Sequence, residues 1–150
     1  GSPASRMVRS LAGGVEVCVT VTLLDGLVLA RSAFHHSMNF RSVVLVGTAT
    51  KVDDVDEKRR AFDVIVDHVM AGRSQVARPA DDVETRTTLV LRLPIVEGSV
   101  KVRTGGPIEE PADLGLPVWA GVVPIATVEG APEPDPLQTV AGLSAPVSRR

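Results

Sequence analysis

The stretch Ser32-Ala-Phe-His-His-Ser-Met-Asn-Phe-Arg-Ser-Val-Val-Leu-Val-Gly-Thr-Ala49 is the most informative part of the sequence for the fold and for a candidate site. Its apolar run from Val43 to Val46, which ends at Gly47, predicts a strand covered on both faces. Two histidines, an asparagine and an arginine stand just before this run. We expect these polar residues where a rigid sheet meets a loop, which is a frequent location for a bound ligand.

The composition indicates one mainly β domain. The chain has 150 residues, of which 44% are hydrophobic, and a mean hydropathy of +0.19, values that suit a single globular core. Twenty-six valines and no tyrosine favour strands, because valine is stiff at χ1. Sixteen basic and eighteen acidic residues give a net charge of −2, so we expect neither nucleic acid nor a membrane surface as a partner.

The cysteine content and the absence of targeting signals predict a cytoplasmic protein. Cys18 is the single cysteine, which excludes an internal disulfide and a cysteine-clustered metal site. The sequence contains no apolar segment long enough to cross a bilayer and no recognisable signal peptide. The chain does not begin with methionine, so either earlier residues are missing or Gly1-Ser2 is a cloning remnant.

The first segment, residues 1–14, is expected to form a short helix. Ser2 can cap it and Gly13-Gly14 can end it. Ser5 and Arg6 would lie in the first turn, where free backbone N–H groups favour an anion. Two interpretations stay open at this point, namely a phosphate site and an ordinary capped helix with a solvated arginine.

The rest of the chain predicts strands around one long helix. Alternating valines predict a strand over residues 15–22, and Asp25-Gly26 predicts a hairpin turn into a second strand over 27–31. Asp54 is expected to cap a helix over residues 53–70, with Lys58 on its solvated face. Further strands are expected over residues 41–52, 87–93, 99–106 and 117–126. Five or six mostly antiparallel strands suit a small barrel or a rolled sheet.

The paired histidines do not by themselves indicate a metal site. His35 and His36 have no further ligand at metal-binding spacing, and His68 lies in the predicted long helix. The sequence has no Gly-x-Ser-x-Gly elbow and no phosphate-binding glycine loop. We therefore predict no dedicated metal site and assign no catalytic residue.

Five motifs spread over nearly the whole chain carry a family resemblance. They are Gly1-Ser-Pro-Ala-Ser-Arg-Met7, Val17-Cys-Val-Thr-Val21, Phe34-His-His-Ser-Met-Asn-Phe-Arg-Ser-Val-Val44, Ser99-Val-Lys-Val-Arg-Thr-Gly105 and Pro117-Val-Trp-Ala-Gly121. In this order they resemble the pyridoxamine 5′-phosphate oxidase-like, FMN-binding split barrels. The resemblance is strongest to the flavin-nucleotide-binding, nitroimidazole-resistance-related branch.

The resemblance implies a mainly β fold and a defined assembly. It implies an antiparallel split β-barrel with one long and one or more short helices over residues 1–130, followed by a flexible, proline-rich tail over residues 131–150. It also implies a homodimer with FMN in each groove between the subunits. Because the family has further strands before the first of these motifs, we expect the N-terminus to be incomplete in this chain.

The resemblance also implies which residues contact the flavin. Ser5 and Arg6, with Arg41 and Ser42, would contact its phosphate, which agrees with the anion-site interpretation of the first helix and suits the bidentate geometry of arginine. Residues of the loop before the apolar strand, and one lysine, would line the flavin or substrate pocket. The cofactor-binding candidates are therefore Ser5, Arg6, Arg41, Ser42, His36, Asn39 and Lys101.

The function that the resemblance implies is that of an FMN-dependent oxidoreductase acting on a small-molecule substrate, with the redox chemistry on the flavin. One alternative is a non-catalytic module that binds or sequesters FMN, a deazaflavin or haem, with His35 or His36 relevant to haem. A further alternative is a paralogue that keeps the dimer interface and has lost the ligand.

Overall fold

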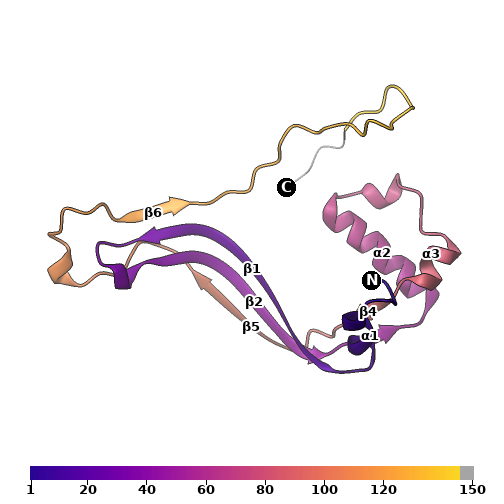
Figure 1. Cartoon of the computed structure of the whole chain (residues 1–150), viewed down its shortest axis with the longest axis horizontal. Coiled ribbons are helices and arrows are strands. Elements are labelled where there is room, and N and C mark those ends of the chain that lie inside the picture. The colour runs from indigo at the N-terminus through magenta and orange to yellow at the C-terminus, as the bar shows by residue number, and fades with distance from the viewer. Residues whose placement is uncertain (146–150) are drawn as a thin grey trace. The chain divides into compact units, whose positions relative to one another are not determined.

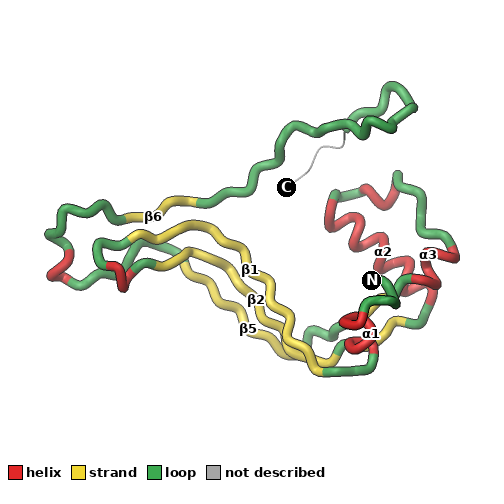
Figure 2. The backbone as a smooth tube through the Cα atoms, viewed as in Figure 1, coloured by secondary structure: helices red, strands yellow, loops and turns green. Residues whose placement is uncertain are grey.

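The computed structural model describes residues 1–145, which divide into two units. The sheet unit comprises Val17–Gly47 and Ile95–Glu129. The helical unit comprises Gly1–Glu16, Thr48–Pro94 and the segment from Gly130 onward. The elements of both units are drawn in Figures 1 and 2, and each unit is described by itself.

The sheet unit is built on four antiparallel strands in the order β5-β2-β1-β6. These strands are β1 (Glu16–Leu29), β2 (Ser37–Thr48), β5 (Glu97–Arg103) and β6 (Gly121–Pro124). In β2 and β5, Phe40 is opposite Arg103 and Val46 is opposite Glu97. Figure 1 shows β1, β2 and β5 running side by side as long strands. The prediction of a mainly β, antiparallel fold is confirmed, and the sheet is not closed.

The predicted hairpin turn at Asp25-Gly26 is wrong, because β1 runs straight through it. Gly26 is buried where β6 pairs with β1, opposite Pro124. A Cβ atom at Gly26 would lie 3.1 Å from both the Val122 Cγ1 and the Val123 carbonyl oxygen. The glycine is therefore explained by the close approach of β6 and not by a change in chain direction.

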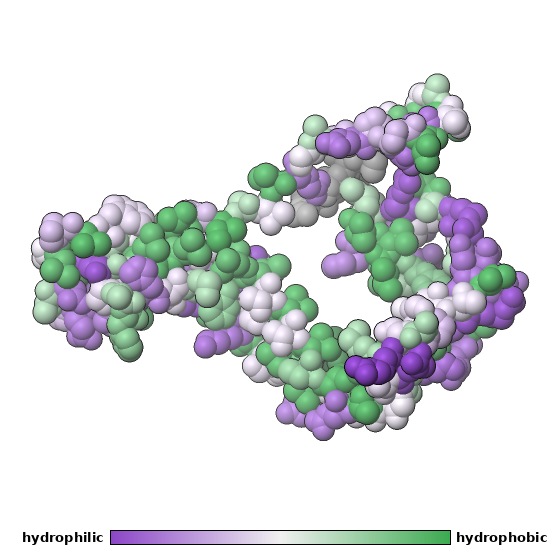
Figure 3. Space-filling view, in the orientation of Figure 1, coloured by the Kyte–Doolittle hydropathy of each residue, from purple (hydrophilic) through white to green (hydrophobic). Residues whose placement is uncertain are grey.

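The core of the sheet unit is small. Val28 is fully buried, whereas the run from Val43 to Val46, which we expected to be covered on both faces, is only half-buried. Large hydrophobic side chains on β1 and β5 are exposed, among them Val19, Val21, Leu23, Val100 and Val102. In Figure 3, hydrophobic residues (green) gather over this unit. The sheet unit thus carries apolar surface that its own residues do not cover.

The helical unit contains three α-helices and a two-stranded antiparallel sheet. Its elements are α1 (Arg6–Ala12), β3 (Thr50–Val52), α2 (Val55–Val69), the 3-10 turn η2 (Arg73–Gln75), α3 (Asp82–Thr87) and β4 (Val90–Arg92), with β3 paired to β4. The strand expected over residues 41–52 is interrupted at Ala49. The strand expected over 87–93 is shortened by α3, which Asp81 and Glu84 begin with a capping box that we did not predict.

The cap that the sequence predicted is confirmed for α2 and is wrong for α1. Asp54 caps α2 as predicted, since its carboxylate accepts the Glu57 backbone N–H at 2.7 Å. Ser5, not Ser2, caps α1, because its Oγ accepts the Val8 N–H at 3.4 Å. Gly72 follows α2 with φ of 76°, the left-handed conformation that glycine adopts without strain.

Lys58 of α2 is buried, although the sequence predicted it on the solvated face. Lys58 is 7% exposed, and its Nζ donates to the Thr85 carbonyl oxygen at 3.2 Å and to the Thr88 carbonyl oxygen at 2.9 Å. These carbonyl groups lie at the C-terminal end of α3, where a positive charge is favourable. Lys58 therefore ties α2 to the end of α3.

We expect Glu84 to make the stability of the helical unit depend on pH. Hydrogen bonds from Arg78 and from the Asp81 backbone N–H hold the pKa of Glu84 at about 2, below its ordinary value of 4.5. Because the pKa is lowered by folding, the stabilisation is present above about pH 4.5 and is lost as the pH falls toward 2. Thermal melts of wild type and Glu84→Gln should differ above pH 4.5 and converge in this range. A constant difference in Tm at all pH values would contradict the assignment.

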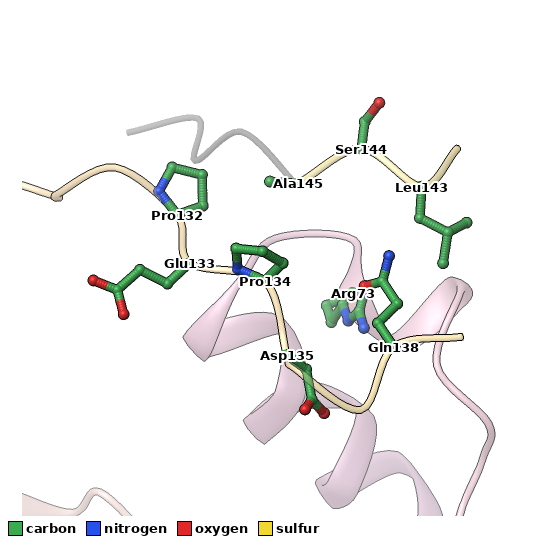
Figure 4. Close-up of a pocket in the computed structure, with 9 residues that line it drawn as sticks. All are labelled: Arg73, Pro132, Glu133, Pro134, Asp135, Gln138, Leu143, Ser144 and Ala145. Atoms are coloured by element: carbon green, nitrogen blue, oxygen red, sulfur yellow. The ribbon is translucent and has the colours of Figure 1, made fainter. Parts of the chain in front are cut away.

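The segment from Gly130 to residue 145 has turns but no helix or strand, and its side chains are exposed. A hollow of about 290 Å³ lies between this segment and Arg73, with Glu133 and Asp135 in its lining (Figure 4). None of the predicted cofactor-binding residues lines it. The last five positions of the predicted flexible tail lie outside the described residues. Within residues 1–145, every helix is too short or too polar to span a bilayer.

Candidate functional site

One face of the sheet unit carries a row of polar side chains across three neighbouring strands. The hydroxyls of Thr22 on β1 and Ser42 on β2 lie 2.9 Å apart. Ser42 is directly opposite Lys101 of β5, so their side chains project from the same face. We call Thr22, Ser42 and Lys101 the polar row. It offers two hydroxyl groups and one ammonium group to a ligand.

The ammonium group of Lys101 is not neutralised by a neighbouring carboxylate. Its Nζ lies 5.9 Å from the centre of the Phe40 ring, a cation–π distance. Within residues 1–145, Lys101 forms no ion pair, whereas Lys51 is paired with Asp53. The positive charge of Lys101 is therefore available to an anionic group.

Arg41 lies on the opposite face from the polar row, because neighbouring residues of a strand alternate between faces. Its Nε and Nη2 donate to the two carboxylate oxygens of Asp25 at 3.0 and 2.8 Å. This pairing lowers the pKa of Asp25 and raises that of Arg41, chiefly through the hydrogen bonds. Arg41 and Ser42, which we predicted as a joint phosphate contact, therefore project from opposite faces of the sheet.

An apolar hollow of about 180 Å³ lies beside Arg41. Its lining consists of Val21, Leu23, Arg41, Ser42, Val43 and Val100. Because valine and leucine dominate this lining, the hollow suits an apolar group next to the Arg41–Asp25 pair.

Ser5 and Arg6 belong to the helical unit. Ser5 Oγ serves as the cap of α1, and Arg6 is the first residue of that helix. Arg6 is exposed and forms no ion pair within residues 1–145. Its guanidinium group is therefore free to bind an anion, as is the ammonium of Lys101 in the sheet unit.

Asn39 has its polar atoms committed to the turn that follows β5. It is 7% exposed, its Oδ1 accepts from Arg103 Nη1 at 2.6 Å, and its Nδ2 donates to the Gly105 carbonyl at 3.1 Å. Gly105 has φ of 96°, a conformation that favours glycine. These bonds give Asn39 a structural role in holding the turn after β5.

The two adjacent histidines lie at the end of a 3-10 turn, η1 (Ala33–His35), rather than on a strand. The Nδ1 of His35 lies 2.9 Å from Ser32 Oγ, and the Nδ1 of His36 lies 3.0 Å from the Ser32 carbonyl oxygen. The Phe34 ring meets the His35 ring edge-on at 5.3 Å, and Phe34 is otherwise 90% exposed. No group of three or more potential metal ligands occurs in the part of the chain that the structure describes.

An ion pair that we did not predict anchors this histidine segment. Glu109 accepts from both the backbone N–H and the guanidinium group of Arg31, and its side chain is only 5% exposed. The pKa of Glu109 is lowered, first by the backbone hydrogen bond of Arg31 and then by its guanidinium group. The two residues are 78 positions apart, so no local pattern in the sequence indicates the pair.

Comparisons with solved structures reveal two close likenesses. The flavocytochrome Anf3 from Azotobacter vinelandii is 41% identical with a TM-score of 0.88, and the match covers 97% of this chain and 67% of that one. The FAD and heme binding protein from Mycobacterium smegmatis is 38% identical with a TM-score of 0.89, covering 97% of this chain and 71% of that one.

A third solved structure supports the fold alone. It is that of a putative 5-nitroimidazole antibiotic resistance protein from Bacteroides thetaiotaomicron, which is 23% identical with a TM-score of 0.53. That match covers 67% of this chain and 57% of the other. No curated protein sequence matches the chain.

The family model described as pyridoxamine 5′-phosphate oxidase matches residues 1–102. This range includes the polar row, Arg41 and the Ser5-Arg6 pair, and the match covers all seven predicted cofactor-binding residues. It confirms the family and the split-barrel fold class predicted from the five motifs. The chain belongs to the pyridoxamine 5′-phosphate oxidase family.

Proposed function

We propose that this chain binds a flavin nucleotide and forms the flavin-holding part of an oxidoreductase that acts on a small molecule. The observation that carries the proposal is the likeness to the FAD and heme binding protein of M. smegmatis, which extends over 97% of this chain. The family match to a pyridoxamine 5′-phosphate oxidase supports the same cofactor class. FMN is the flavin that the resemblance implied, and FAD is the one bound by that relative.

The chain's own residues supply what a flavin phosphate needs. Lys101 offers an uncompensated positive charge. The Thr22–Ser42 hydroxyl pair beside it keeps one O–H for a ligand, because the other forms the bond between the two residues. Arg6 of the helical unit, with Ser5 beside it, is a separate candidate for the same kind of group. Phosphate oxygens form charge-assisted hydrogen bonds with these groups, each contributing about 1.5–3 kcal/mol. FMN and FAD both carry such a phosphate and riboflavin does not.

Arg41 is a phosphate contact only if it leaves Asp25. The two-pronged bond between them competes with any phosphate for the guanidinium group. We therefore assign the phosphate contact to the polar row. Arg41, on the opposite face, is an alternative contact that a ligand would have to win from Asp25.

A bound flavin would supply the redox chemistry through its ring. The chain's part is to hold and orient that ring and to keep water from it. Val21, Val43 and Val100 lie on the Arg41 face of the sheet, so their side chains would exclude water only from a flavin bound on that face. No side chain of the described residues is assigned as a proton donor or acceptor for the substrate.

The active form that we propose is a cytoplasmic homodimer with the flavin in the groove between the subunits. The exposed apolar side chains of β1 and β5 support it, because soluble monomers rarely leave such a surface uncovered. A second copy on this surface would complete the core of the sheet unit. Sedimentation equilibrium should give twice the chain mass, and a monomer at all concentrations that bind flavin would contradict the dimer.

Haem binding is a second function, favoured by a specific observation. Both relatives at about 40% identity are haem proteins by description, one a flavocytochrome and the other an FAD and heme binding protein. In this chain the imidazole groups of His35 and His36 are the donors chemically suited to haem iron. A chain that held both groups without turnover would be a binding module.

Titration with riboflavin, FMN and FAD tests the flavin proposal. Quenching of flavin fluorescence should show FMN or FAD binding at least about tenfold more tightly than riboflavin, the effect of a single charge-assisted hydrogen bond to phosphate. Equal affinities would remove the phosphate assignment. Absence of binding by all three flavins would overturn the proposed function, and tight binding of a deazaflavin instead would identify that alternative.

A further inference from the structure

The hydrogen bond of His36 fixes which of its ring nitrogens carries the proton. Its Nδ1 lies 3.0 Å from the carbonyl oxygen of Ser32. A carbonyl oxygen only accepts, so the Nδ1 of His36 must be the donor. By contrast, the Nδ1 of His35 faces the Ser32 hydroxyl at 2.9 Å, which can donate or accept. Only the tautomer of His36 is therefore determined by its partner.

A neutral His36 with its proton on Nδ1 carries a free electron pair on Nε2. Histidines that bind metals are commonly arranged in this way, with the other ring N–H given to a backbone carbonyl, which fixes the tautomer and the ring orientation. His36 is exposed, and within residues 1–145 its Nε2 has no hydrogen-bond partner. The Nε2 atom is thus available to a ligand approaching from outside the sheet unit.

We propose that His36, through Nε2, is the axial ligand of haem iron in this protein. The inference rests on the haem-binding part of the proposed function and names the residue that carries it out. The side chains of Phe34 and Met38, two positions before and after it, are 90% and 51% exposed. They provide apolar surface of the kind that a porphyrin plane requires.

The backbone that holds His36 is itself anchored. Glu109, with its side chain 5% exposed, binds both the N–H and the guanidinium group of Arg31. Arg31 directly precedes Ser32, whose carbonyl oxygen accepts the hydrogen bond from the Nδ1 of His36. This anchoring orients the ring before a ligand arrives, which lowers the entropy cost of binding.

The other histidines fit the role less well. The ring of His35 is half-buried and meets the Phe34 ring edge-on at 5.3 Å, and its Nδ1 pairs with a side-chain hydroxyl that can donate or accept. His68 lies in the last turn of α2, in the helical unit. His68 therefore serves as the control for an experiment on His36, and His35 is the competing donor.

The test is titration of the full chain with haemin, the ferric iron protoporphyrin, followed by Soret absorption and by electron paramagnetic resonance of the iron. His36→Ala should lower the affinity for haemin at least about tenfold and change the resonance spectrum. Loss of a residue that only orients a metal ligand already costs about 10- to 100-fold in metal affinity, so loss of the ligand itself should cost no less. Added imidazole should restore the wild-type spectrum. His68→Ala and Ser32→Ala should keep it, since Ser32→Ala removes only the bond to His35.

Three results separate the possibilities. A His36→Ala protein that binds haemin with wild-type affinity and spectrum overturns the assignment, as does a loss confined to His35→Ala. A wild type that takes up no haemin overturns both the assignment and the haem-binding function. Flavin affinity of wild type and His36→Ala, measured in parallel, shows whether the flavin proposal survives either outcome. Circular dichroism of the exposed His36→Ala variant checks its fold.

Discussion

Replacing Lys58 with methionine should lower the free energy of unfolding by about 3 kcal/mol. Lys58 is 7% exposed, and its Nζ donates to the carbonyl groups of Thr85 and Thr88 at 3.2 and 2.9 Å. Methionine keeps most of the volume of the side chain but removes both charge-assisted bonds. Each such bond contributes roughly 1.5–3 kcal/mol, and the carbonyl groups left behind lose their partner. Denaturant unfolding at pH 7 measures the change.

Lys51→Met is the matched control for this substitution. Lys51 is also a lysine of the helical unit, but its side chain is 43% exposed and paired with Asp53 at the surface. Exposed ion pairs contribute only about 0–1 kcal/mol. Equal losses of stability in the two variants would contradict the inference that the buried bonds of Lys58 join α2 to α3.

Replacing Lys101 with methionine should weaken binding of FMN or FAD by about 1.5–3 kcal/mol, roughly tenfold to 150-fold in affinity. The loss follows from removal of the one positive charge of the polar row, which sits opposite Ser42. If Arg6 of the helical unit holds the phosphate instead, Arg6→Ala and not Lys101→Met should show this loss. Isothermal titration with each flavin measures both variants.

Riboflavin is the matched ligand for this experiment, because it has the ring but no phosphate. Its affinity should be the same for wild type and Lys101→Met, and Lys51→Met should leave all three flavins unchanged. Arg41→Ala tests the alternative that the phosphate binds on the opposite face of the sheet, where Arg41 would have to leave Asp25. In that case Arg41→Ala should weaken FMN binding and Lys101→Met should not. Unchanged FMN and FAD affinity in all three variants, Arg6→Ala, Arg41→Ala and Lys101→Met, would sink the phosphate assignment.

The features that the sequence predicted correctly are local ones. The cap at Asp54 and the end of α2 before Gly72 follow from side chains within a few positions of the helix. Strand β5 (Glu97–Arg103) follows from its own alternation, although it begins and ends earlier than the predicted range 99–106. The family was identified from five motifs in order along the chain, and the family match over residues 1–102 covers the first three of them and part of the fourth.

The features that it missed depend on residues far away along the chain. The Asp25-Gly26 pair is typical of a turn, but Gly26 is needed because β6, almost a hundred positions later, lies close to it. Lys58 belongs to a charged helical face and is buried only because the end of α3 meets it. No periodicity within a single segment carries such information.

In the candidate site, too, local features could be predicted and features that join distant residues could not. Ser42 and Lys101 were predicted separately, and the strand register that puts them opposite each other, with Thr22 beside them, is a property of the sheet. The separation of Arg41 from Ser42 follows from simple alternation and was predictable. The Arg31–Glu109 pair joins residues 78 positions apart and was not.

The central claim, that this chain binds a flavin nucleotide, is tested most directly by the absorption spectrum of the purified protein. We expect a yellow protein whose flavin, released by denaturation, is identified by chromatography as FMN or FAD. A Soret band beside the flavin bands would support haem as well. A colourless protein that fails to quench the fluorescence of added FMN and FAD would contradict the claim.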